Sequence, residues 1–121
     1  MKDYTLGPVE RQFADLIWEN EPLSSRELVV LAGEALSWKK STTYTILRRL
    51  SERGLFRNEN GTVTSCLSRE DFLARQSRRY VEDSFGGSLP RFLAAFTAKE
   101  KLNGAEVEAL RRLIAQSGEE K

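Results

Sequence analysis

The residues best suited to chemistry lie between Trp38 and Leu67, where cationic, hydroxyl and aromatic side chains are concentrated. Specific DNA binding requires phosphate anchors and base-edge readers in one rigid frame. A helix that begins near Lys40 would carry short hydroxyls in its first turns, and threonine can hydrogen-bond a base edge or contact a thymine methyl. The candidates for DNA binding on this helix are Lys39, Lys40, Ser41, Thr42, Thr43, Tyr44, Arg48 and Arg49.

Basic charge is concentrated in the same segment, although the chain as a whole is nearly neutral with a net charge of +1. Residues 36–57 carry six basic side chains against one acidic, whereas residues 1–35 carry three basic and seven acidic ones. A neutral protein with one concentrated basic segment is typical of polyanion binding through a local patch. The alternative interpretation is a solvated helix face with no partner.

Composition limits the classes of protein that fit this chain. Its 121 residues, 40% hydrophobic and 31% charged, suit one soluble domain or a small domain with an appendage. No apolar run approaches the roughly 20 residues of a membrane span, and Met1–Thr5 has no apolar signal core, so we expect a cytoplasmic protein without membrane insertion. One cysteine and no histidine disfavour a metal site and histidine-based catalysis, and we expect no cofactor.

Three helices are predicted in the first half of the chain. Pro8 suits the first position of the first helix, where its missing N–H costs little. Ser24, with Glu27 three residues later, forms a capping box that begins the second helix. A third helix over about 40–53 would end at Gly54 as its C′ residue.

A β-hairpin is predicted directly after the third helix. Residues 55–58 and 62–67 are rich in β-formers, and the intervening Asn60-Gly61 pair accepts the positive φ of a type I′ turn. Three helices followed by a hairpin is the order of a winged helix-turn-helix, with the third helix as recognition helix. Arg57 and Asn60 on the wing are further DNA-binding candidates. Cys66, within the strand pattern, is expected to be a small buried residue.

Residues 68–121 are predicted to form a helical dimerisation domain that follows a winged-helix DNA-binding domain of residues 1–67. The whole fold is thus mainly α with a small β-hairpin wing. Three helices hold about a dozen large apolar side chains, more than they can readily bury alone, and a second copy of the chain would cover them. The alternative is a monomer whose helices pack back on the winged helix. The expected dimerisation residues are Tyr80, Phe85, Leu89, Phe92, Leu93, Phe96, Leu110, Leu113 and Ile114.

Several individual residues have a structural interpretation beside the functional one. Ser41 or Thr42 would cap the third helix instead of reading bases, and Tyr44 would pack under the wing. Trp38 is expected to be a buried wedge between helices rather than a base contact. The second basic group is expected on a solvated face or in salt bridges with the acidic N-terminal helices, in preference to DNA contact: Arg75, Arg78 and Arg79.

The sequence resembles the penicillinase-repressor family of winged-helix transcriptional repressors along nearly its full length. The matching segments include the start of the first helix, the recognition helix and two C-terminal elements: Leu6-Gly7-Pro8-Val9-Glu10, Thr42-Thr43-Tyr44-Thr45-Ile46-Leu47-Arg48-Arg49-Leu50, Asp83-Ser84-Phe85-Gly86-Gly87-Ser88 and Leu102-Asn103-Gly104-Ala105-Glu106-Val107. The resemblance implies a homodimer that binds a two-fold-related operator and releases it on a signal.

The resemblance also implies two routes of release, and the chain departs from the pattern of both. In β-lactam-responsive members a membrane sensor-protease triggers cleavage of an Asn-Phe bond in the fifth helix. The corresponding pair here is Ala95-Phe96, so the asparagine is missing. Copper-responsive members bind metal through a cysteine-rich tail, and the tail from Gln116 to Lys121 contains no cysteine.

The leading hypothesis is a cytoplasmic repressor that binds a pseudo-palindromic, double-stranded operator as a homodimer. Thr42 and Thr43 would read bases while the lysines and arginines of the third helix hold phosphates. The alternative is a winged-helix protein-interaction module whose basic face meets an acidic protein surface. An enzyme is the weakest hypothesis, because no set of catalytic side chains occurs at a useful spacing.

Overall fold

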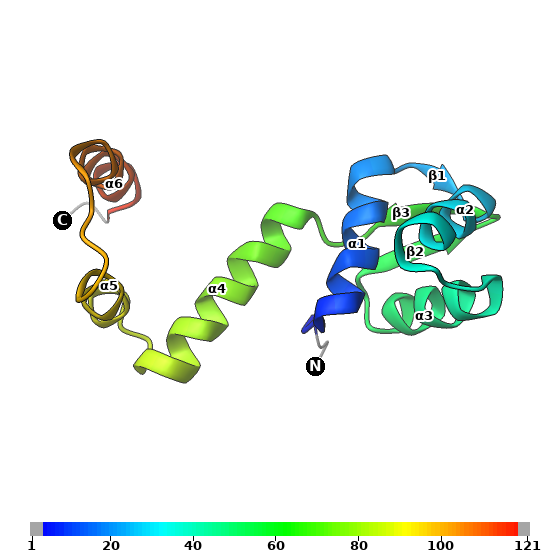
Figure 1. Cartoon of the computed structure of the whole chain (residues 1–121), viewed down its shortest axis with the longest axis horizontal. Coiled ribbons are helices and arrows are strands. Elements are labelled where there is room, and N and C mark those ends of the chain that lie inside the picture. Colours follow the sequence, from blue (N-terminus) through cyan, green and yellow to red (C-terminus); the bar gives the residue numbers. More distant parts are fainter. Residues whose placement is uncertain (1–3, 119–121) are drawn as a thin grey trace. The chain divides into compact units, whose positions relative to one another are not determined.

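The protein is described by a computed structural model over residues 4–118. Within this range it forms six helices and three short strands (Figure 1): α1 (Pro8–Asn20), β1 (Leu23–Ser24), α2 (Ser25–Leu36), α3 (Lys40–Glu52), β2 (Phe56–Glu59), β3 (Thr62–Ser65), α4 (Arg69–Phe85), α5 (Leu89–Thr97) and α6 (Gly104–Ser117). The mainly helical fold with a hairpin wing is therefore confirmed. None of the helices in residues 4–118 has the length and apolar content needed to cross a bilayer.

The helix starts follow the capping signals in the sequence. Pro8 occupies the first position of α1, and the Ser24 hydroxyl accepts a hydrogen bond from the Glu27 amide at 3.0 Å to begin α2. Asn103 accepts from the Glu106 amide at 2.8 Å in the same way at α6. These side chains satisfy amide groups that the first turn of a helix leaves without partners.

The wing is a tight hairpin within a three-stranded antiparallel sheet of order β1-β3-β2. Its turn residues Asn60 and Gly61 have φ of 53° and 82°, as a type I′ turn requires. The sequence did not predict β1, which pairs Leu23 with Val63. The expectation for Cys66 was wrong: β3 ends at Ser65, and the Cys66 side chain beyond it is exposed.

One hydrophobic core holds α1, α2, α3 and the sheet together. Trp38 lies half-buried against this core with its ring 5.1 Å from that of Phe13, which confirms it as a packing residue. Trp18 is likewise half-buried, and its ring lies 5.6 Å from that of Phe56 and 5.4 Å from that of Phe72, tilted against both. The largest fully buried side chains are Phe13, Phe56, Phe72, Ile17, Leu28, Leu50, Leu55, Val63 and Thr43.

The chain divides into two compact units between Ser77 and Arg78, inside α4 and ten residues beyond the boundary at 67/68 that the sequence indicated. The reason is that Leu67 and Phe72 belong to the core of the first unit. The first turns of α4 belong to the first unit and its last turns to the second, and the helix is continuous across this boundary (Figure 1).

The second unit has an aromatic cluster but no buried side chain in α5 or α6. Phe92 lies at the centre of this cluster, with its ring 5.5 Å from Phe85, 6.1 Å from Tyr80 and 6.2 Å from Phe96. Large apolar groups therefore remain open to solvent in a single copy of the chain, including Leu89, Leu113 and Ile114.

The geometry of the wing turn predicts the effect of Gly61→Ala. A Cβ there would meet no atom within 4 Å, but the φ of +82° is unfavourable for alanine, so the free energy of unfolding should fall by about 1 kcal/mol. Gly33→Ala is the control in the same unit, because its Cβ would make an ordinary contact at 3.7 Å within a helix and should raise stability by up to about 1 kcal/mol. Chemical denaturation measures both, and equal effects would contradict the assigned turn.

Candidate nucleic-acid interface

Helix α3 turns one side into the core and the opposite side to solvent. Thr43, Leu47 and Leu50, spaced i, i+4 and i+7, are its buried residues. Because an α-helix has 3.6 residues per turn, side chains about half a turn away from these must face outward. The exposed face consists of Ser41, Thr42, Thr45, Arg48, Arg49 and Glu52.

Thr43 was wrongly predicted as a base reader. Its side chain is 1% exposed, and its hydroxyl donates to the Lys39 carbonyl at 3.1 Å. The methyl is therefore buried in the first unit, and the hydroxyl already has a hydrogen-bond partner there. A base edge cannot reach either group without opening the core.

Thr45 carries an exposed hydroxyl on α3, unlike Thr43, and it was absent from the predicted site. It is exposed and lies between Thr42 and Arg49 at i+3 and i+4 spacing, at the middle of the outward face. A helical projection that placed Leu47 and Leu50 in the core would have identified it from the sequence.

Ser41 and Thr42 do not cap the helix. The N-cap residue is Lys39 in extended conformation, and no side-chain hydrogen bond caps α3. Both hydroxyls are on exposed residues in the first turn, where a groove-inserted helix contacts base edges. The only acidic residue of the face, Glu52, is at the far end of α3, so the N-terminal half is the part suited to DNA.

Four cations of the basic segment are free of ion pairs within the described residues 4–118: Lys39, Lys40, Arg48 and Arg49. All four are exposed. Arg53 differs, because its guanidinium lies 3.5 Å from the Glu10 carboxylate and also donates to the Thr5 carbonyl. The charge available to phosphates is thus concentrated on the outward face and at the start of α3.

The wing is connected to α3 through the first residue of α2. The Ser25 amide donates to the Gly61 carbonyl at 2.8 Å, and the Tyr44 hydroxyl donates to the Ser25 hydroxyl at 3.2 Å. Tyr44 is half-buried in this arrangement and holds the wing tip indirectly. Asn60 and Arg57 are exposed on the wing, with Arg57 3.4 Å from Glu59.

The second basic group is on α4. Arg78 and Arg79 pair with Glu82 and Asp83 one turn further along α4, at 3.0 and 3.6 Å. The guanidinium of Arg75 lies 4.9 Å from the centre of the Tyr4 ring. All three arginines are exposed, which agrees with the solvated face that was one of the two expected alternatives. Ion pairs between the start of α4 and α1 are made by Arg69, with Asp15 and Glu19.

A helix-turn-helix with a hairpin wing and a cationic, hydroxyl-bearing recognition helix defines a DNA-binding protein of the winged-helix class. The sequence matches the family described as Penicillinase repressor over residues 6–116. The chain belongs to this family, and transcriptional repression is the function that the family indicates.

The relatives are regulatory proteins. Methicillin resistance regulatory protein MecI of Staphylococcus aureus strain Mu50 is 22% identical over 117 residues, which cover 93% of this chain and 95% of that protein. Penicillinase repressor of Staphylococcus aureus is also 22% identical, with 93% of both chains covered. MecI of Mammaliicoccus sciuri is 21% identical over 117 residues, which cover 93% of this chain and 95% of that protein. These relatives are repressors or regulators, which confirms that the chain is not an enzyme.

The contrast between Thr43 and Thr42 predicts different stability effects. Thr43→Ala removes a buried methyl and a hydrogen bond, whereas Thr42→Ala removes neither. Both gain the same helix propensity, so the difference between them isolates burial and should be about 1–2 kcal/mol in the free energy of unfolding. Thermal or urea denaturation measures it. Equal stabilities would contradict the orientation of α3.

Proposed function

We propose that the protein is a homodimeric transcriptional repressor of the cytoplasm that binds a pseudo-palindromic operator through α3 and the wing. The observation that carries this proposal is the outward face of α3, where exposed hydroxyls lie beside cations without ion-pair partners in residues 4–118. Ser41, Thr42 and Thr45 contact base edges in the major groove, since short hydroxyls can read either partner of a base pair.

Phosphate contacts come from the cations around these hydroxyls. Lys39 and Lys40 lie at the entry of α3, and Arg48 and Arg49 lie two turns later on the outward side. Each cation that neutralises a phosphate releases a counterion, so affinity falls steeply as salt is raised. Arg57 and Asn60 contact the backbone or minor groove, and Tyr44 acts by holding the wing in place.

Dimerisation through the second unit accounts for its exposed apolar side chains. Leu113 and Ile114 on α6 are 56% and 60% exposed, and Leu89 and Phe96 on α5 are 54% and 52% exposed. Burying a large apolar side chain contributes roughly 1.5–3 kcal/mol, so a few such residues per chain drive association. Two recognition helices then bind two half-sites, which multiplies their affinities.

Release by proteolysis is a second part of the proposal. Ala95 and Phe96 are exposed residues of α5, so cleavage there would separate part of the dimerisation segment from the winged helix. A sensor-activated protease would be the partner. Incubation with lysate from β-lactam-treated host cells tests this step, and a chain that stays intact while repression is lifted would eliminate it.

A protein-interaction module is the alternative function. The same basic face would then meet an acidic protein surface, and α5 and α6 would dock that partner. A gel shift with DNA from upstream of the gene separates the two functions at low salt. Absence of any shift would favour the interaction module.

The proposal predicts the effect of removing the arginine pair on α3. Arg48→Ala with Arg49→Ala should weaken operator binding at least about a hundredfold and lower the salt dependence, because two phosphate contacts are lost. The matched control is Arg78→Ala with Arg79→Ala, an arginine pair on α4. Fluorescence anisotropy measures the affinity for DNA, and analytical ultracentrifugation shows whether the variant still dimerises. Unchanged affinity in the α3 variant would show that α3 is not the binding helix.

The proposed dimer predicts the effect of charges on α6. Leu113→Glu with Ile114→Glu should convert the dimer to monomer at micromolar concentration, because two exposed apolar contacts are replaced by carboxylates. Val30→Glu is the control, since Val30 is 58% exposed on α2, close to the 60% of Ile114. Analytical ultracentrifugation reads the result. Loss of the dimer in both variants, or in neither, would contradict this interface.

A further inference from the structure

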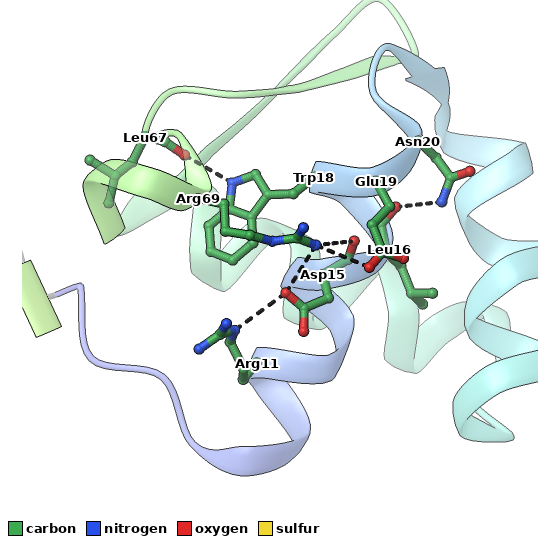
Figure 2. A network of polar contacts seen from close by, with 8 residues as sticks. All are labelled: Arg11, Asp15, Leu16, Trp18, Glu19, Asn20, Leu67 and Arg69. Carbon is green, nitrogen blue, oxygen red and sulfur yellow. Dashed lines mark hydrogen bonds and ion pairs between the residues drawn. The ribbon is translucent and has the colours of Figure 1, made fainter. Parts of the chain in front are cut away.

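The base of α4 is held against α1 by a network centred on Arg69. Figure 2 shows its guanidinium lying beside the Trp18 indole and pointing at the acidic side of α1. The Arg69 Nη2 is 3.2 Å from the Asp15 carboxylate, 3.1 Å from the Glu19 carboxylate and 3.4 Å from the Asp15 carbonyl. Its carbon Cζ lies 5.7 Å from the centre of the Trp18 ring.

Three further contacts fix the same junction. The Trp18 indole N–H donates to the Leu67 carbonyl at 2.9 Å, just before α4 begins. Arg11 pairs with Asp15 at 3.3 Å and lies 5.3 Å from the centre of the Phe72 ring. Arg69 and Phe72, three residues apart on α4, thus both contact Trp18 of α1.

Arg69 is suited to set a direction rather than to add stability. Its side chain is 32% exposed, and ion pairs of this exposure contribute little to folding. However, Nη2 contacts the carboxylates of two successive turns of α1, and Cζ lies over the Trp18 ring, so the side chain ties the start of α4 to several points on α1. Its Nε is buried without a hydrogen-bond partner within the described residues, so Arg69 is held by the contacts of Nη2 and by the cation–π contact with Trp18.

We infer that Arg69 is a positioning residue that sets the direction in which α4 leaves the winged helix, and thereby restricts the half-site spacing that the dimer accepts. The inference rests on the proposed function. In a dimer formed by the second unit, α4 is the covalent connection between each winged helix and the interface. A base of α4 that is fixed on α1 limits where each recognition helix can reach. If the contacts between α4 and α1 were removed, the dimer could also bind half-sites at other spacings.

The test uses the full chain and the DNA that the wild-type protein selects from a random duplex pool. The half-sites of that DNA are then moved apart by about two base pairs, which rotates one by roughly 70° around the duplex. The wild-type protein should lose at least about a hundredfold in affinity, because both half-sites can no longer be engaged together. Arg69→Met, which keeps an apolar stem over Trp18, should lose much less than this on the displaced DNA and bind the original DNA more weakly. Its affinity for a single half-site should match that of the wild type.

Two further variants test whether a change in spacing preference comes from the contacts of Arg69 with α1. Asp15→Asn with Glu19→Gln removes the partners of Arg69 from the α1 side and should give the same relaxed spacing. Arg78→Met is the matched control, because Arg78 is also on α4, is 83% exposed and, among residues 4–118, pairs with Glu82 of its own helix at 3.0 Å. It should behave as the wild type does. Equal spacing discrimination in Arg69→Met and wild type would overturn the inference.

A measurement without DNA separates this inference from the proposed function. Nitroxides are placed at Gln12→Cys and Gln76→Cys, two exposed positions on α1 and α4, with Cys66→Ser as background and an excess of unlabelled chain. The distance distribution should be narrow with Arg69 and broad with Arg69→Met. An unchanged distribution would refute the positioning role. A wild-type protein that selects no DNA would instead refute the proposed function, and the spacing inference with it.

Discussion

The proposed binding face depends on the burial of one side of α3. Thr43, Leu47 and Leu50 fix the rotation of this helix about its axis, because their burial in the core permits no other orientation. Helical geometry then places Thr45 and Arg48 on the outward side. The exposed hydroxyls and cations need no partners of their own within the first unit, since packing on the opposite side of α3 positions them.

Helix α4 joins two parts of the chain that differ in how they are stabilised. Its first turns belong to a unit with a complete core, to which Phe72 contributes a fully buried ring. Its last turns belong to a unit in which α5 and α6 bury no residue in a single chain. In the proposed dimer, the apolar helices of the second unit join two winged helices, and DNA affinity would then depend on the integrity of the second unit. Cleavage in α5 would exploit this dependence.

Local signals in the sequence predicted most of the fold, whereas features that depend on long-range contacts were missed. The Ser24 cap and the Asn60-Gly61 turn act within a few residues, so they were found at the expected positions. Strand β1 has only two residues and exists through its pairing with β3. Arg69 gains its role from α1 residues about 50 positions earlier in the chain, and no local pattern marks it.

The sequence identified the helix that carries the candidate site, but it did not separate the exposed residues of this helix from the buried ones. Placing hydroxyls in the first turns identified Ser41 and Thr42 as accessible residues but also included the buried Thr43. The most direct test of the proposed binding face is backbone NMR of the protein titrated with the duplex that it selects. The largest amide shifts should fall on Ser41, Thr42, Thr45, Arg48 and Arg49. Shifts confined to α5 and α6, with the amides of α3 unmoved, would contradict it.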